Sequence, residues 1–84
     1  MNIVIIEDEL LTAEDLTEII CQIGQGIKIA AVLDSVKEAI CFFQKGQPVD
    51  LIFSDIQLGD GLSFEIFRAV RIEVPIIFCT AYDE

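Results

Sequence analysis

The chain has 84 residues and a formal charge of −10, from 15 acidic and 5 basic side chains, with no histidine or tryptophan. Because 54% of the residues are apolar, the composition excludes intrinsic disorder, which combines high net charge with low hydrophobicity. The few basic residues are scattered, which argues against a free-standing nucleic-acid-binding protein, and the length fits one small domain.

The chain begins with an apolar run followed by a helical pattern. Residues 3–6 are all branched aliphatic residues, which is typical of a strand covered on both faces. From Glu9 the apolar residues recur at helical spacing, so we predict an amphipathic helix that ends at Gly24 and Gly26. Its predicted buried stripe consists of Ala13, Leu16, Ile20 and Ile23.

A second strand and helix follow. Residues 27–33, with an outward-facing lysine, predict a strand near a sheet edge. Ser35 as N-cap and Glu38 three residues later form a capping box, which satisfies two otherwise unpaired amides. Gly46 and Pro48 end this helix. Its predicted buried stripe consists of Val36, Ala39, Ile40 and Phe43.

The last part of the chain repeats the alternation. Residues 51–53 predict a buried strand, which ends at a serine and an aspartate. A loop containing Gly59 and Gly61 leads to a third helix, and Pro75 separates this helix from a fourth strand at residues 76–79. The third helix is expected to bury Phe64, Phe67 and Val70 or their neighbours.

Strands that alternate with helices predict an α/β fold, an open parallel sheet with helices on both faces. The fourth strand, residues 76–79, would then be an exposed hydrophobic edge close to the last residue given. Natural domains avoid such edges, and open parallel sheets usually contain five or six strands. We therefore expect either that the natural chain continues, which we favour, or that a partner covers this edge.

The cysteines and the hydropathy pattern bear on location. Three widely spaced cysteines without a C-x-x-C motif, in a chain without histidine, do not form a zinc site. They fit a reducing cytoplasm. No apolar stretch approaches the ~20 residues of a membrane span, so we expect a cytoplasmic protein without membrane contact.

Acidic and hydroxyl side chains follow three of the predicted strands. In an open parallel sheet, ligands bind beyond the carboxyl ends of the strands, where these side chains would converge. Clustered carboxylates repel one another, and a hard divalent cation with oxygen ligands, Mg²⁺, relieves that repulsion. An ionised aspartate beside Mg²⁺ can attack phosphorus and form an acyl phosphate. The candidate residues are Glu7, Asp8 and Glu9 after the first strand, Asp55 after the third and Thr80 after the fourth.

Each of these residues also has a simpler interpretation. Asp8 and Glu9 could serve only to begin the following helix, whose dipole favours anions. Asp55 could be a turn former, and Thr80 an ordinary residue at a strand end. Their shared position at one end of adjacent strands favours the functional interpretation.

Three segments resemble the receiver domain of two-component response regulators, and the resemblance covers the whole chain. They are residues 3–9 (IVIIEDE), 50–61 (DLIFSDIQLGDG) and 75–82 (PIIFCTAY). The details look most like regulators of the LytR/AlgR class, in which a LytTR-type DNA-binding domain follows the receiver. The resemblance implies a flavodoxin-like, CheY-like open sheet with strand order 2-1-3-4 over residues 1–84, here without the final helix–strand–helix portion.

The resemblance also implies roles for individual residues. Asp55 matches the phosphoacceptor, which takes a phosphoryl group from a histidine kinase. Glu7 and Asp8 match the acidic pair that holds Mg²⁺, Asp8 directly and Glu7 through water. The backbone carbonyl of Gln57 matches the third protein ligand, and Thr80 matches the switch hydroxyl that bonds the phosphoryl group.

One feature of the family is missing. Receivers carry a lysine at the end of a fifth strand, and none of the three lysines here follows a predicted strand. We therefore expect the acidic site to bind Mg²⁺, while phosphorylation-dependent signalling is lost in a chain of this length.

The leading hypothesis is a phosphorelay signalling module, not an enzyme, which a sensor histidine kinase phosphorylates and which in its full form controls transcription. It would reach DNA only through a C-terminal output domain that is absent here, and the exposed fourth strand favours self-association. A scaffold of the same fold that never becomes phosphorylated stays open as an alternative. A phosphatase of the haloacid-dehalogenase type is disfavoured, because Gln57 stands where that chemistry requires a second aspartate.

Overall fold

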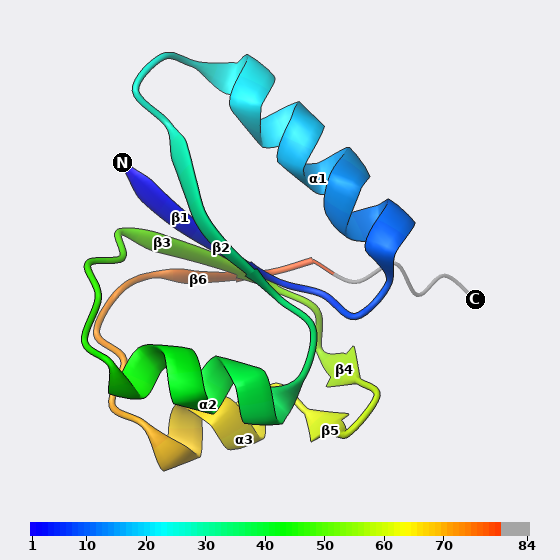
Figure 1. Ribbon diagram of the computed structural model, residues 1–84, viewed down its shortest axis with the longest axis vertical. Coiled ribbons are helices and arrows are strands. Elements are labelled where there is room, and N and C mark those ends of the chain that lie inside the picture. The colour runs from blue at the N-terminus through cyan, green and yellow to red at the C-terminus, as the bar shows by residue number, and fades with distance from the viewer. Residues whose placement is uncertain (80–84) are drawn as a thin grey trace.

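A four-stranded parallel sheet forms the centre of the molecule, whose computed structural model describes residues 1–79. The elements in chain order are β1 (Asn2–Ile6), α1 (Leu10–Ile23), β2 (Lys28–Leu33), α2 (Val36–Gln44), β3 (Leu51–Ser54), β4 (Gln57–Leu58), β5 (Gly61–Leu62), α3 (Phe64–Ala69) and β6 (Ile76–Phe78). The sheet has the order β2-β1-β3-β6 (Figure 1). This confirms the predicted α/β class and strand order, with β6 as the fourth strand. No helix within residues 1–79 is long and apolar enough to cross a bilayer.

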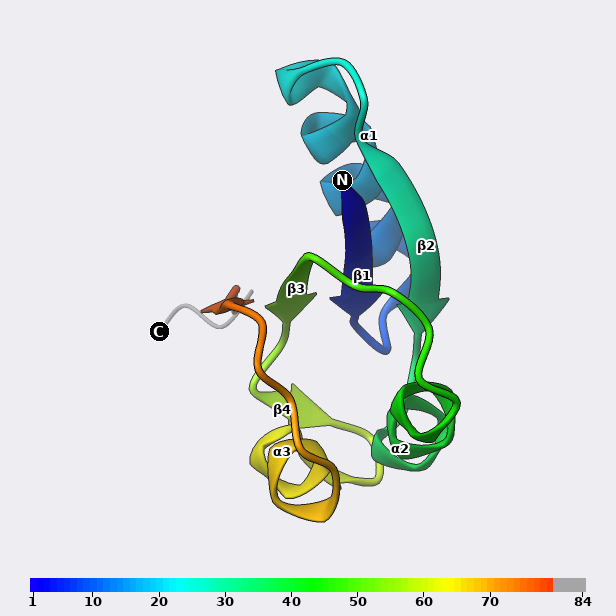
Figure 2. The same ribbon diagram turned by 90° about the vertical axis from the view of Figure 1, so that its left-hand side faces the viewer.

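The helices cover both faces of the sheet, as the sequence predicted. α1 lies on one face, and α2 and α3 lie on the other (Figure 2). Side chains of a strand alternate between its two faces, so β1, which is apolar throughout, contributes to both layers. Ile3 and Ile5 pack with Ile20 of α1, whereas Val4 and Ile6 pack toward α2 and α3. The uninterrupted aliphatic run of β1 therefore indicates its central position in the sheet.

The N-terminus of α2 has the predicted cap with one difference. The Ser35 hydroxyl accepts a hydrogen bond from the Glu38 amide at 3.0 Å. The Glu38 carboxylate bonds the Asp34 amide at 3.1 Å, one residue before the position that a capping box uses. The cap still satisfies two amides and fixes the start of the helix.

Two of the expected buried side chains are exposed. Ile23 of α1 is 71% exposed, because three positions of an α-helix turn it about 60° away from the buried Ile20. Phe64 of α3 is 45% exposed, while its neighbour Ile66 is fully buried. The six-residue helix α3 is too short for its apolar residues to define one face, and packing against the sheet selects Ile66.

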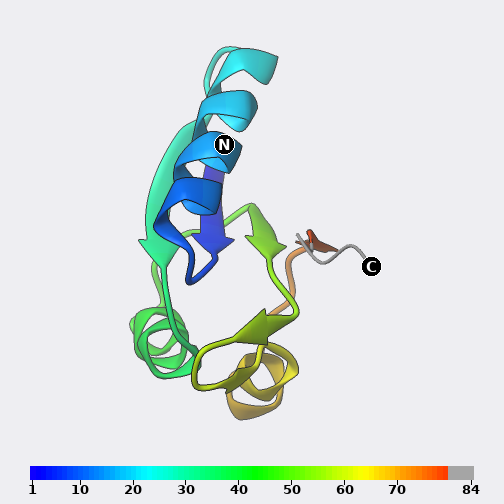
Figure 3. The ribbon, with the colours of Figure 1, turned by 90° about the vertical axis from the view of Figure 1, so that its right-hand side faces the viewer.

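A short hairpin, β4–β5, occupies the loop after β3 and was not predicted. Gln57 pairs with Leu62, and Leu58 pairs with Gly61, in antiparallel orientation. Leu58 is buried in the core layer of α2 and α3, and Figure 3 shows the hairpin beside these two helices. A two-residue strand gives no periodic pattern, so only the turn-forming glycines marked this segment in the sequence.

The fourth strand has the exposure that its position at the edge predicted. In residues 1–79, β6 pairs with β3 and with no other strand. Ile77 is 44% exposed and Phe78 is 40% exposed. The ring of Phe78 packs edge-on against Phe64, with the ring centroids 5.3 Å apart. An apolar edge is therefore present on the described part of the molecule.

Candidate metal centre

Three carboxylates meet at the carboxyl ends of β1 and β3, in the middle of the sheet. One oxygen each of Glu7, Asp8 and Asp55 lies within 4.8 Å of the others. The parallel pairing of the strands places them there, because Ile6 pairs with Ser54 and the Asp55 amide donates to the Ile6 carbonyl at 2.9 Å. The structure therefore brings together three of the residues that the sequence singled out.

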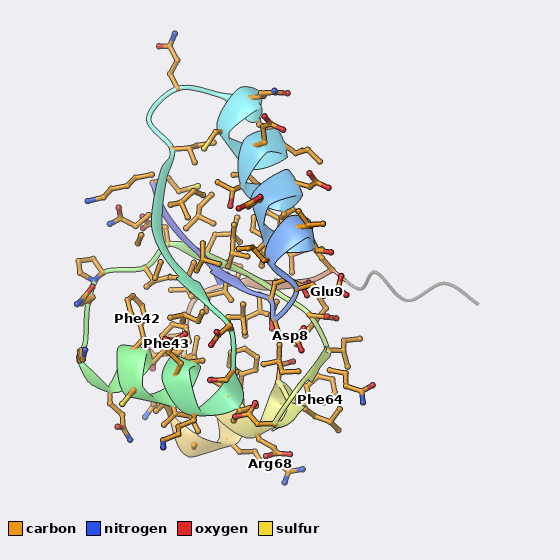
Figure 4. All side chains as sticks on the ribbon, turned by 45° about the vertical axis from the view of Figure 1, so that its right-hand side comes forward. Asp8, Glu9, Phe42, Phe43, Phe64 and Arg68 are labelled. Atoms are coloured by element: carbon orange, nitrogen blue, oxygen red, sulfur yellow. The ribbon has the colours of Figure 1, made fainter. Side chains whose placement is uncertain are left out.

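Glu9 does not join this cluster. It stands at the N-cap position of α1, and its carboxylate accepts a hydrogen bond from the Thr12 hydroxyl at 3.0 Å. Figure 4 shows Asp8 and Glu9 in the turn between β1 and α1. The simpler interpretation, a residue that begins the helix, fits Glu9.

Backbone amides hold two of the three carboxylates in place. Glu7 is only 6% exposed, and its Oε2 accepts a hydrogen bond from the Glu9 amide at 3.1 Å. The half-buried Asp55 accepts a hydrogen bond on Oδ1 from the Ile56 amide at 2.7 Å. Asp8 is exposed. The cluster thus has a fixed, buried side and a side that faces solvent.

The cluster is electrostatically unfavourable as it stands. Burial raises the pKa of Glu7, and the charges of Asp55 and Asp8 raise it further, against the opposing effect of a backbone amide. The ion pair found within residues 1–79 joins Arg71 to Glu73 at 2.9 Å, both exposed, in the loop that leads into β6. No cationic side chain of the described chain therefore neutralises the three acids.

The donor set fits a hard divalent cation. Carboxylate oxygens are the preferred protein ligands of Mg²⁺, which keeps several of its waters and usually binds through one or two carboxylates. A cavity of about 340 Å³ opens beside Glu7 and Asp8. It is lined by Glu7, Asp8, Leu10, Ala13, Val32, Asp34 and Glu38.

Gln57 and Thr80 are the two further sequence candidates. Gln57 begins the hairpin that follows Asp55, with an exposed side chain. The hairpin passes close to the acids, since a Cβ on Gly59 would lie 3.6 Å from Oδ2 of Asp8. Thr80 lies outside the described residues. The residue before it, Cys79, donates its amide to the Ser54 carbonyl at 2.9 Å.

Asp60, at the tip of the hairpin, has a role that the sequence did not reveal. Its carboxylate accepts hydrogen bonds from the amides of Val36 at 2.8 Å and Lys37 at 3.1 Å, the first two residues of α2. These bonds lower the pKa of Asp60. Because the partners are more than twenty positions apart in the chain, no local motif could have indicated the contact; an aspartate in a turn was the only signal.

The comparisons with known proteins agree with this geometry. The family model of the response regulator receiver domain matches residues 3–84. The chain belongs to the response regulator receiver family. This receiver sequence is 30% identical over 87 residues to the sensory transduction protein LytT of Bacillus anthracis, across 100% of the chain. It is 40% identical over 88 residues to the phyllosphere-induced regulator PhyR of Methylorubrum extorquens, across 99% of the chain.

This receiver spans about a third of the length of those relatives, 35% of LytT and 32% of PhyR. Its fold is similar to the N-terminal domain of a response regulator/sensory box/GGDEF three-domain protein from Carboxydothermus hydrogenoformans. That match has a TM-score of 0.85 at 28% identity and covers 100% of this chain and 67% of the other. Receiver domains are signalling domains, which typically hold Mg²⁺ in an acidic cluster, and the cluster of Glu7, Asp8 and Asp55 has that character.

Proposed function

We propose that this receiver accepts a phosphoryl group from a sensor histidine kinase on Asp55. Glu7, Asp8 and Asp55, together with the backbone carbonyl of Gln57, would hold Mg²⁺, Asp8 directly and Glu7 through water. The observation that carries the proposal is the meeting of three carboxylate oxygens within 4.8 Å of one another. Such a cluster is costly without a cation, and its position at the carboxyl ends of the central strands is where open parallel sheets bind ligands.

Asp55 has one oxygen available for the reaction. Its Oδ1 accepts the Ile56 amide, and within the described part of the chain Oδ2 accepts no hydrogen bond from a protein group. Attack of Oδ2 on phosphohistidine would form an O–P bond while the P–N bond breaks, and the imidazole nitrogen would leave with the electron pair. Bound Mg²⁺ would neutralise charge on the phosphoryl oxygens. We assign Thr80 the switch role, donating its hydroxyl to the phosphoryl group.

The test combines phosphorylation with metal titration. The protein is incubated with acetyl phosphate, with Mg²⁺ or with EDTA, and its intact mass is measured. We expect a Mg²⁺-dependent gain of one phosphoryl group, which Asp55→Asn abolishes and Glu18→Gln, on the exposed face of α1, leaves unchanged. Calorimetric titration should show Mg²⁺ binding that Asp8→Asn and Asp55→Asn weaken. A mass gain that persists in Asp55→Asn, or Mg²⁺ binding indifferent to both variants, would refute the assignment.

A scaffold of the same fold that is never phosphorylated is the second candidate. It is favoured by the placement of the lysines: Lys28 begins β2, Lys37 lies in α2 and Lys45 follows it, so none in residues 1–79 follows a strand. Mg²⁺ binding without any phosphoryl gain would support this candidate.

The proposal extends to the whole protein in three respects. The whole protein would act in the cytoplasm and would control transcription through a separate output domain. Any contact with DNA would be made by that output domain. The apolar edge at β6 adds self-association of the receiver.

A further inference from the structure

The tip of the β4–β5 hairpin lies near Asp8 of the acidic cluster and is bonded to the start of α2. On one side, Gly59 lies next to Asp8, since a Cβ added at Gly59 would be in ordinary van der Waals contact with Oδ2, at 3.6 Å. On the other side, Asp60 bonds the first two amides of α2. Gly59 and Asp60 are consecutive residues, so a shift of the hairpin tip changes both contacts at once.

The base of the hairpin is held independently of its tip. The Ser63 amide and hydroxyl donate to the Ile56 carbonyl at 2.9 and 3.2 Å, and Leu58 is 4% exposed in the core. Gln57, the residue whose carbonyl is proposed as a ligand, belongs to this base and pairs with Leu62. The tip has no comparable burial, since Gly59 and Asp60 are exposed; besides the pairing of Leu58 with Gly61, the bonds to α2 restrain it.

We propose that Asp60 is a positioning residue, which holds the hairpin against α2 so that Asp8 and the Gln57 carbonyl are presented to the cation. The inference rests on the proposed Mg²⁺ centre and adds a coupling to it. If the contacts of Asp60 with α2 strengthen cation binding, cation binding must strengthen those contacts by the same free energy. Occupancy of the acidic cluster therefore strengthens the bonds between Asp60 and the N-terminus of α2, and the start of α2 reports whether the centre is occupied.

The chain offers a matched control for this idea. Ser35 caps the same helix by accepting a hydrogen bond from the Glu38 amide, and within residues 1–79 it forms no hydrogen bond with the hairpin. Asp60→Ala and Ser35→Ala each remove a cap from α2, yet only Asp60→Ala releases the hairpin. A difference between the two variants therefore reflects the hairpin and not the loss of helix stability.

The first experiment measures Mg²⁺ affinity by calorimetry for the unaltered protein and the two variants, under conditions where circular dichroism shows all three folded. Removal of a group that orients metal ligands typically lowers metal affinity by about 10–100-fold. We expect about a tenfold loss for Asp60→Ala, a loss below about twofold for Ser35→Ala, and partial recovery in Asp60→Asn, whose amide oxygen can accept one of the two bonds. Equal affinities in Asp60→Ala and Ser35→Ala would overturn the inference while leaving the metal centre intact.

The second experiment measures amide hydrogen exchange with and without Mg²⁺. Protection of the Val36 and Lys37 amides should rise several-fold on addition of Mg²⁺, and that of the Glu38 amide, bonded to Ser35, should change less. Unchanged protection of Val36 and Lys37 at saturating Mg²⁺ would overturn the coupling. Failure of the unaltered protein to bind Mg²⁺ would overturn the proposed function, and this inference with it.

Discussion

Replacing Glu7 with glutamine should stabilise the metal-free protein, although Glu7 belongs to the proposed metal centre. The change is nearly isosteric, and the glutamine oxygen can still accept the Glu9 amide, which bonds Oε2 of Glu7 at 3.1 Å. It removes a charge that is only 6% exposed and that faces the carboxylates of Asp8 and Asp55. A functional site that sacrifices stability in this way is expected to gain it when its charge is removed.

The size of the gain follows from the geometry. The three carboxylate oxygens lie within 4.8 Å of one another, and two unit charges at that separation repel by about 1 kcal/mol in water and about 3.5 kcal/mol at an effective dielectric constant of 20. Glu7 faces two such charges. Because Asp8 is exposed and Asp55 half-buried, the lower end applies, and we expect Glu7→Gln to raise the free energy of unfolding by about 1–3 kcal/mol.

Magnesium should offset this gain, and it should reverse the order of stability where the gain of Glu7→Gln is below about 2.7 kcal/mol. A ligand at 100 times its dissociation constant stabilises the native state by about 2.7 kcal/mol, and only the unaltered protein should gain that much. Urea unfolding followed by circular dichroism, in EDTA and in Mg²⁺, measures both effects, with Glu18→Gln as a control for net charge. A Glu7→Gln protein that is less stable than the unaltered one in EDTA, or that gains equally from Mg²⁺, would refute the reasoning.

The pH dependence gives a separate check. Burial raises the pKa of Glu7 above its ordinary value of 4.5, so the folded protein binds this proton more tightly than the unfolded chain does. The stability that Glu7 contributes is therefore greatest at low pH and is lost as the pH rises through its raised pKa. The advantage of Glu7→Gln should be full above that pKa and should fade as the pH falls toward 4.5.

Three further predictions concern the rest of the fold. The bonds from α2 lower the pKa of Asp60. The stability that Asp60 contributes is therefore present above the pKa of an unfolded aspartate and is lost as the pH falls through the lowered value. The urea midpoints of the unaltered protein and of Asp60→Asn should accordingly differ at pH 7 and converge in acid. Ile66→Ala, at a fully buried position, should lower the free energy of unfolding by about 2–5 kcal/mol. Ile23→Ala, at a site 71% exposed, should change it by less than about 0.5 kcal/mol. Equal losses in the two variants would contradict the packing of both helices. Sedimentation should show self-association that salt strengthens by screening the charge of −10 and that Ile77→Lys weakens; a salt-independent monomer would remove the proposed role of the β6 edge.

The sequence predicted the acidic cluster because its geometry follows from a general rule. Parallel strands end at the same edge of a sheet, so residues directly after two apolar runs must be neighbours once those runs pair side by side. Glu7, Asp8 and Asp55 satisfied that condition, and their approach needed no knowledge of the loops. Glu9 lies one residue further on, where the chain has already turned into α1, and the rule no longer applies.

The hairpin and its bond to α2 could not be predicted in the same way. The contact of Asp60 with Val36 depends on how two loops fold over one end of the sheet, and nothing near either residue specifies it. The choice between Phe64 and Ile66 is similar, since both are large and apolar and only the position of α3 on the sheet decides between them. What sequence patterns leave open here is the tertiary placement of short segments.

The two layers of the molecule are unequal, and this has a consequence for ion binding. The buried core cluster on the α1 side consists of Ile3, Ile5 and Ile20, and Ala13 of α1 is buried as well. The cluster on the other side consists of Val4, Ile6, Leu33, Val36, Ala39, Ile52, Leu58 and Ile66. Regions with few buried apolar contacts open at lower free energy than the rest, so α1 should undock while the remainder stays folded. The turn that carries Asp8 leads directly into α1, so undocking of this helix would also move Asp8 away from the other two carboxylates. The affinity measured for an ion then depends on the fraction of molecules in which α1 is docked. Substitutions that stabilise the packing of α1 on the sheet would therefore raise the affinity without changing a metal ligand.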